Sequence, residues 1–148
     1  MLLARARLLV ATLWAGSLWT VGYLAAPTLF ATLSDRVLAG TIAASLFRIE
    51  AMLSLACGAA LLLLLWLGKD FSVARQRTLL LVIVAMLACT VASHFGLQPL
   101  MAELRAAAGP AGVMESAAKS RFGMLHGISS SIFLVQSLLA GWLVIKQQ

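Results

Sequence analysis

The sequence carries little charge: Asp, Glu, Lys and Arg make up 11% of its 148 residues, whereas hydrophobic residues make up 62%. A water-soluble domain usually has about a quarter charged residues, because polar side chains have to cover its apolar core. The shortage of charge therefore excludes a bundle that folds in water. It predicts a chain whose surface is covered mostly by lipid.

Cysteine is also scarce. Cys57 and Cys89 are the two cysteines, and they lie in the middle of separate apolar runs without a CxxC or metal-ligand spacing. This pattern predicts small buried thiols rather than a disulfide framework.

Catalytic motifs are missing as well. The sequence has no GxSxG, no HExxH, no phosphate-binding loop and no pair of carboxylates in one span, so nothing in it indicates a classical enzyme. It also lacks the central charge and paired broken helices of transporters. The formal net charge of +6 comes from basic residues beside the apolar runs, without the basic face of a nucleic-acid-binding protein.

What the sequence does have is four long apolar runs. A hydrocarbon core about 30 Å thick requires roughly 20 helical residues, and lipid permits only helices for spans of this kind. The first run is too long for the apolar part of a signal peptide, which has roughly 7–15 residues. We therefore expect a single transmembrane domain, residues 1–148, folded as an all-α four-helix bundle. Its predicted spans cover about residues 8–30, 46–67, 78–100 and 123–145.

The charges of the short connecting segments indicate the orientation. With four spans, the N-terminus, residues 68–77 and the C-terminus share one side, which carries a single acid, Asp70. The positive-inside rule assigns short segments dense in Lys and Arg to the cytoplasm. We expect a bacterial inner-membrane protein with both termini in the cytoplasm, and Trp66 and Trp142 in the aromatic belt on that side. The basic residues of this side are Arg5, Arg7, Lys69, Arg75, Arg77 and Lys146.

The two outer loops are predicted to hold short helices at the membrane surface. Ser34 can serve as the N-cap of a short helix within residues 34–47. In the longer loop, residues 101–122, the helical pattern stops before Gly109-Pro110. Glu115 and Lys119 then have the i,i+4 spacing of a second short helical turn.

The polar residues of the spans gather towards the outer side, and the inner halves contain almost nothing polar. Ionisable residues within a span are costly in lipid and are therefore functional candidates. Glu50 is not spaced to pair with Arg48 on a helix, so a partner is expected from across the bundle, from Arg105 or Arg121. The expected outer polar cluster comprises Arg48, Glu50, Gln98, Arg105, Arg121 and Ser129.

Two histidines accompany this cluster. His94 and His126 lie about two turns and one turn from the outer ends of their spans, which places them at similar depths. If the third and fourth helices are neighbours, both imidazoles could face one pocket and hold a haem. Copper is a second alternative, because thioethers and imidazoles suit Cu(I). The simpler interpretation is that the histidines form hydrogen bonds and the methionines pack, so no cofactor is expected. The methionines concerned are Met52, Met101, Met114 and Met124.

Small residues and tryptophans indicate where helices approach one another. A stripe of small residues allows two backbones to pack closely in lipid. Trp14 and Trp19 are deep enough in the first span to be expected between helices. The predicted stripes are Ser54 with Gly58 on the second span, and Ser130, Ser137 and Gly141 on the fourth.

Motifs spread over nearly the whole chain carry a family resemblance. They are Ala-Pro-Thr-Leu-Phe at 26–30, Gln-Pro-Leu-Met at 98–101 followed by Leu-Arg at 104–105, and Arg-Phe-Gly-Met-Leu-His-Gly-Ile-Ser at 121–129. In these motifs the chain resembles the transmembrane-protein-205-like family, whose bacterial members are small four-span proteins of unknown function. The fold is also similar to that of copper-resistance membrane proteins and of a haem-dependent protoporphyrinogen oxidase. The resemblance implies a four-helix membrane fold with the signature residues Pro27, Phe30, Pro99, Arg105, His126 and Ser129.

Together these patterns predict a non-enzymatic inner-membrane protein with a polar pocket near the outer leaflet, with the lipid bilayer as its surroundings and no nucleic-acid partner. One alternative is a haem- or copper-binding membrane protein that uses His94 and His126. Another is an assembly or stress factor that acts through helix–helix contacts with a membrane-protein partner.

Overall fold

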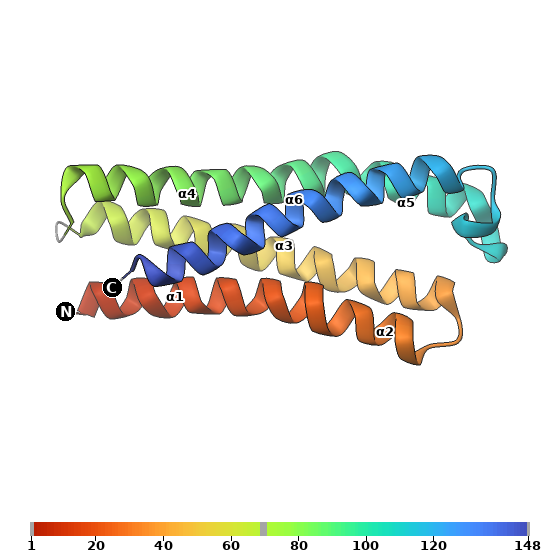
Figure 1. Cartoon of the computed structure of the whole chain (residues 1–148), viewed down its shortest axis with the longest axis horizontal. Helices are drawn as coiled ribbons and strands as arrows, with labels where there is room; N and C mark the ends of the chain where they lie inside the picture. The colour runs from red at the N-terminus through yellow and green to blue at the C-terminus, as the bar shows by residue number, and fades with distance from the viewer. Residues whose placement is uncertain (1, 69–70, 148) are drawn as a thin grey trace.

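The computed structural model describes residues 2–68 and 71–147, and in this part the chain is helical except for short connections, with no strand. Four long helical segments lie side by side and alternate in direction (Figure 1), and all four are long and apolar enough to cross a membrane. This confirms the predicted all-α four-helix fold. The segments are α1 (Leu2–Trp19) with η1 (Thr20–Ala25) and α2 (Ala26–Thr32), α3 (Arg36–Leu67), α4 (Val73–Val91) with η2 (Ala92–Leu97) and α5 (Gln98–Ala108), and α6 (Lys119–Ile145).

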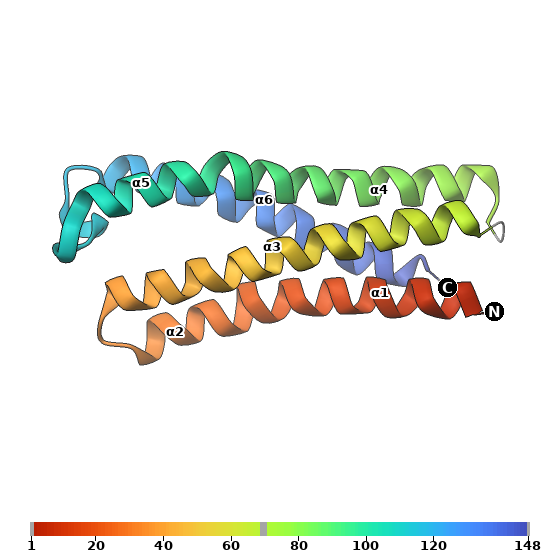
Figure 2. The ribbon, with the colours of Figure 1, turned by 180° about the vertical axis from the view of Figure 1, so that it is seen from behind.

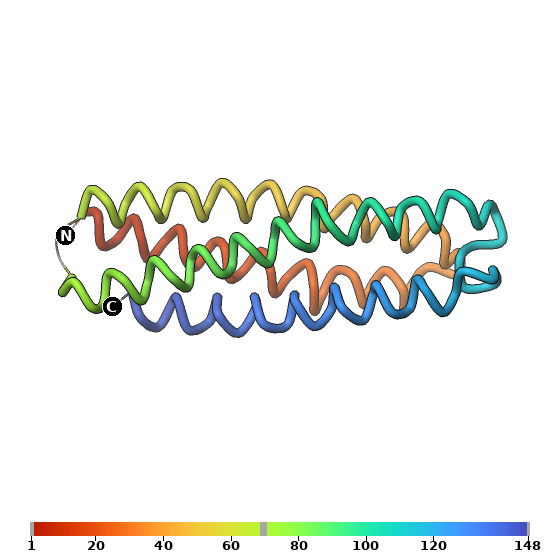
Figure 3. The backbone as a smooth tube through the Cα atoms, turned by 90° about the horizontal axis from the view of Figure 1, so that it is seen from above, coloured from red at the N-terminus to blue at the C-terminus, as the bar shows by residue number. Residues whose placement is uncertain are grey.

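The bundle has two distinct ends. The first residues of α1, the end of α3, the start of α4 and the end of α6 lie at one end, called here the termini end (Figures 1 and 2). The connections at 33–35 and 109–118 lie at the other, called the loop end. Seen from above, the four segments run along one another over the length of the bundle (Figure 3). Because α3 and α6 each pack against both α1 and α4, the segments form a closed ring in cross-section.

Two helices change their winding at equivalent places. In η1 and η2 the chain is π-helical, and the N–H groups of Ala26 and Gln98 donate to Val21 and Ser93 O, five residues back. Pro27 and Pro99 follow directly. A proline removes one backbone N–H and its ring crowds the carbonyl four residues before it, and a π-helical turn makes room for such a disturbance.

The two halves of the bundle repeat this arrangement with an offset of 72 residues, which separates η1 from η2 and Pro27 from Pro99. The buried positions of α1 and α4 are also separated by 72 residues. Because α1 and α4 lie diagonally opposite in the ring, the two helical hairpins resemble one unit used twice. The matching buried residues are Arg7, Ala11, Trp14 and Leu18 of α1 and Leu79, Ile83, Met86 and Thr90 of α4.

Apolar side chains cover the outside of the bundle as well as its core. Leu9, Leu81 and Leu138 are each about 70% exposed, as expected where lipid replaces water around a protein. The chain is therefore a multi-pass membrane protein. Its core is formed by Trp14, Leu18, Leu61, Leu79, Ile83, Met86 and Leu143, with small residues between them.

The loop end differs from the prediction. Residues 36–47 are the first turns of α3 rather than a separate short helix, and the N-cap is Asp35, whose carboxylate accepts from the N–H groups of Val37 and Leu38. α5 does stop before Gly109-Pro110, and Gly109 and Gly112 take the positive φ angles that the turn requires.

The predicted Glu115–Lys119 pair also differs. Glu115 ends the 3-10 turn η4 (Val113–Glu115), whereas Lys119 is the first residue of α6. Because the two residues lie on different elements, they do not share one helical turn.

Candidate functional site

The expected outer polar cluster does not assemble around one pocket. Arg48 and Arg121 are exposed, and Gln98, Arg105 and Ser129 are half-buried. Glu50 alone is buried, at 6% exposure. The prediction that Arg105 or Arg121 pairs with Glu50 is wrong, because Arg105 lies over the Phe122 ring and Glu50 has a partner on its own helix.

Glu50 belongs to a buried chain of hydrogen bonds between α1 and α3. Trp14 Nε1 donates to Ser54 Oγ at 2.7 Å, and Ser54 Oγ donates to Glu50 Oε1 at 2.6 Å, one turn back along α3. Trp14 and Ser54 are both fully buried. In lipid a polar side chain without a partner is costly, and this chain of donors provides partners for the indole, the hydroxyl and one carboxylate oxygen.

The two histidines occupy different environments. His94 lies in η2, is half-buried, and contacts the neighbouring Phe95 edge to face. His126 is exposed on α6 and stacks on Phe122, with the ring planes 6° apart and the centroids separated by 6.1 Å. Each imidazole therefore packs against a phenylalanine of its own helix.

Two signature residues of the family resemblance lie close together in the structure. Arg105 of α5 lies over Phe122 at 5.9 Å from the ring centroid, and His126 stacks on the same ring. The signature residues Arg105 and His126 thus meet on Phe122 at the loop end. Pro27 and Pro99 follow the π-helical turns, Phe30 is partly exposed beside Gly40, and Ser129 is half-buried.

A metal site of the usual kind is absent from the described residues, since no three His, Cys, Asp or Glu side chains are grouped there. Cys57 and Cys89 are free thiols, as the sequence indicates. The four methionines of the copper alternative also differ in environment. Met101 is buried, whereas Met52, Met114 and Met124 are about half exposed.

A second buried polar contact joins α4 to α6. Gln136 Nε2 donates to Thr90 Oγ1 at 2.9 Å, and Thr90 Oγ1 donates to Met86 O at 3.2 Å. Gln136 lies in the termini half of α6, so the expectation that the inner halves are nearly free of polar groups is wrong. The lone Gln in an apolar run was the available sequence signal for this contact.

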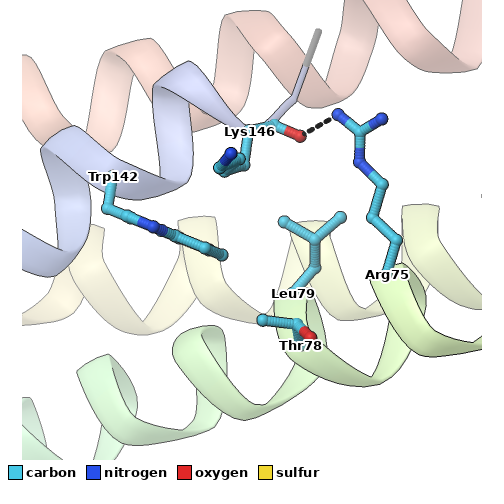
Figure 4. A pocket seen from close by; sticks show the side chains of 5 residues that line it. All are labelled: Arg75, Thr78, Leu79, Trp142 and Lys146. Carbon is cyan, nitrogen blue, oxygen red and sulfur yellow. Dashed lines mark hydrogen bonds between the residues drawn. The ribbon is translucent and has the colours of Figure 1, made fainter.

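The termini end is closed by basic and aromatic side chains. The guanidinium groups of Arg7 and Arg75 both lie over the Phe71 ring, at 4.6 and 4.7 Å from its centroid. Arg75 Nη2 also donates to Lys146 O at 2.6 Å (Figure 4). In the same turn of α4, Gln76 Nε2 donates to Leu65 O at 3.1 Å. The first turn of α4 therefore caps the terminal carbonyls of both α3 and α6.

Small residues have two different roles. Ser54, Gly58 and Gly141 are sites of close helix approach, as predicted, because a Cβ at Gly58 would reach Leu87 and one at Gly141 would reach Trp19. Trp14 and Trp19 also pack between helices, and Trp19 Nε1 donates to Ser137 O at 3.3 Å.

By contrast, other small residues face outwards. Gly123, Gly127 and Ser131 follow one another at i,i+4 spacing on the exposed side of α6, and a Cβ at either glycine would meet nothing within 4 Å. A shallow groove of about 520 Å³ follows a similar series on α1. It is formed by Thr12, Gly16 and Thr20 together with Leu13, Ser17 and Val21.

The polar groups of the bundle differ in access. Ser54 has a carboxylate beside its hydroxyl, and it is fully buried. The exposed features include the His126 imidazole, the small residues of α6 and the groove on α1.

The family described as a domain of unknown function (DUF4149) matches residues 9–110. This range includes Pro27, Phe30, Pro99 and Arg105, whereas His126 and Ser129 lie beyond it. No curated protein and no solved structure matches the chain.

Proposed function

The chain belongs to the DUF4149 family of domains of unknown function, and we propose that it is a non-enzymatic adaptor that holds a transmembrane helix of a partner protein against its own α6. The observation that carries this proposal is the outward stripe of Gly123, Gly127 and Ser131. Glycine at i,i+4 spacing lets a second backbone approach closely, which favours helix association where lipid supplies no hydrophobic driving force.

Polar side chains beside the stripe support the same function. His126 and Ser130 are exposed on α6 at its edge, and the His126 ring is held in place by its stacking on Phe122. A polar group that faces lipid gains from a hydrogen-bonding partner on another helix. The preferred partner is therefore a transmembrane helix with small residues and at least one polar side chain.

A photo-reactive side chain at Ser130 tests this proposal in native membranes. The expected result is one discrete protein adduct, which forms again when the identified partner and this chain are combined in lipid vesicles. Gly127→Ile should abolish the adduct because its side chain fills the contact surface. Ile128→Phe is the matched control, since it also adds bulk on α6, and Ile128 is exposed but points about 100° away from Gly127 around the helix.

Three results contradict the adaptor function. Adducts with lipid alone would show that the stripe faces the bilayer, and adducts with a second copy of the chain alone would show a self-association surface. Equal loss in Gly127→Ile and Ile128→Phe would show a general packing defect of α6.

The cofactor alternative is carried by His94 in the π-helical turn η2, because π-helical turns are frequent at functional sites. A haem bound by His94 or His126 would give a Soret band in the purified protein, and copper would appear in metal analysis at a stoichiometric amount. Loss of the signal in His94→Ala or His126→Ala supports this alternative. A colourless, metal-free protein purified from cells supplied with haem and copper contradicts it.

The narrower family and the membrane orientation are proposed from the sequence motifs and from the charges of the loops. We assign the chain to the transmembrane-protein-205-like proteins and to the bacterial inner membrane, with the basic termini end in the cytoplasm. A reporter fused after Gln148 that is active only in the cytoplasm supports this orientation. Activity only in the periplasm overturns it.

A further inference from the structure

An arginine, a phenylalanine and a histidine form a cluster at the loop end, where α5 contacts the first turns of α6 (Figure 1). The Arg105 guanidinium lies over the Phe122 ring, 5.9 Å from its centroid. The His126 ring stacks on the same phenylalanine, with the centroids 6.1 Å apart. Two side chains that donate hydrogen bonds through N–H groups therefore flank one aromatic ring.

The positive charge of Arg105 has no acidic partner within residues 2–68 and 71–147. There the guanidinium contacts the Phe122 ring and no carboxylate. The residues that border the gap at 69–70, Gly68 and Phe71, belong to the termini end, at the opposite end of the bundle. The acids of the described part of the chain are Asp35, Glu50, Glu103 and Glu115.

Burial makes this charge a binding feature. Arg105 is half-buried, and a charge that is removed from water without a partner costs free energy. The planar guanidinium donates two parallel hydrogen bonds to a carboxylate, which makes arginine the usual cation of buried and interfacial ion pairs. An anion from outside the chain would therefore complete the cluster.

The cluster borders the helix-docking stripe of α6. At 100° per residue, His126 points about 60° away from Gly123 around the helix. Along the helix, Phe122 precedes Trp142 by 20 residues, a rise of about 30 Å, which equals the thickness of the hydrocarbon core. With Trp142 at one membrane boundary, the cluster lies at the other, where an acidic side chain of a docked helix keeps contact with water and stays ionised.

We propose that Arg105 and His126 bind the carboxylate of an aspartate or glutamate on the transmembrane helix that docks against Gly123 and Gly127. This inference rests on the proposed adaptor function and names the chemistry of the partner: small residues that face α6, and an acid at the level of the loop end. Charge complementarity of this kind selects the correct partner and fixes its register. A lipid phosphate carries the same charge, but the exposed glycines beside the cluster favour a helix.

A double-mutant cycle tests the pair, with the partner identified from the Ser130 adduct and vesicles of phosphatidylcholine, which has no net charge. Arg105→Gln should weaken binding of the partner about tenfold, the scale of one charge-assisted hydrogen bond. Replacement of the partner's acid by its amide should weaken binding equally while this chain stays unaltered. The two changes together should weaken binding no further than either alone.

Arg121→Gln is the matched control, because Arg121 is an exposed arginine at the same end of α6 and points about 140° away from His126. It should leave the affinity unchanged. Equal weakening in Arg121→Gln and Arg105→Gln would overturn the pair in favour of diffuse charge attraction.

Three further results would overturn the acidic partner: additive effects in the cycle, a docked helix without an acid, or binding that requires phosphatidylglycerol, which would assign the anion to a lipid. In each of these cases the Ser130 adduct still forms, so the adaptor function stands. The absence of any protein adduct would overturn both proposals.

Discussion

At the scale of single residues, environment decides which polar groups matter. Glu50 and Arg48 are two residues apart, yet Glu50 is buried and hydrogen-bonded whereas Arg48 is exposed. The tryptophans differ in the same way, since Trp14 is fully buried and Trp66 is 77% exposed. The side-chain type was visible in the sequence, but its burial depended on which helix faced it.

Trp14→Phe tests the buried hydrogen-bond chain. The variant keeps an aromatic ring but removes the donor to Ser54, so the free energy of unfolding should fall by about 1 kcal/mol, the scale of interhelical hydrogen bonds in membranes. Unfolding in mixed micelles with increasing denaturing detergent measures the change. Trp66→Phe is the control. If it lowers the free energy of unfolding as much as Trp14→Phe does, the loss does not come from the buried indole hydrogen bond.

At the scale of elements, a glycine allows close helix approach only where it faces a neighbouring helix. A Cβ at Gly58 would lie 2.8 Å from Leu87 Cγ, whereas a Cβ at Gly16 would meet nothing within 4 Å. The same residue type therefore joins α3 to α4 at one position and leaves an open surface on α1 at the other.

Gly58→Ala and Gly16→Ala should consequently have opposite effects. Gly58→Ala should destabilise the bundle by about 1–3 kcal/mol, because the added methyl group overpacks the contact with Leu87. Gly16→Ala should be neutral or stabilising by up to about 1 kcal/mol, because alanine favours the helix. Thermal unfolding in one detergent measures both, and a stable Gly58→Ala variant would contradict the close α3–α4 contact.

At the scale of the whole molecule, the bundle is longer than a bilayer is thick. The 32 residues of α3 give a helix of about 48 Å, compared with about 30 Å for the hydrocarbon core. We expect one boundary near Trp66 and Trp142, at the basic termini end, which would place the first turns of α3 beyond the other boundary. The loop end is then predicted to be a water-exposed extension of the bundle.

Cysteine labelling tests this extension. In a chain with Cys57→Ala and Cys89→Ala, Ser45→Cys should react with a membrane-impermeant maleimide, whereas Leu63→Cys should not, although both positions are exposed on α3. Labelling of Ser45→Cys in intact spheroplasts would also place the loop end outside. Protection of both positions would show that α3 lies tilted within the bilayer.

The sequence by itself determined that lipid surrounds the chain, that the chain has four spans and that these spans are helical. These follow from composition and run length, since lipid leaves long apolar runs only one way to satisfy their backbone hydrogen bonds. It also indicated the packing role of Ser54 and Gly58.

Only the tertiary structure decided which side chains meet. It separated His94 from His126 by environment, joined Arg105 and His126 through Phe122, and gave Glu50 a partner through Ser54 rather than an arginine. The physical reason is that an apolar helix in lipid has no polar face to mark its inner side, so its rotation depends on the shapes of its neighbours.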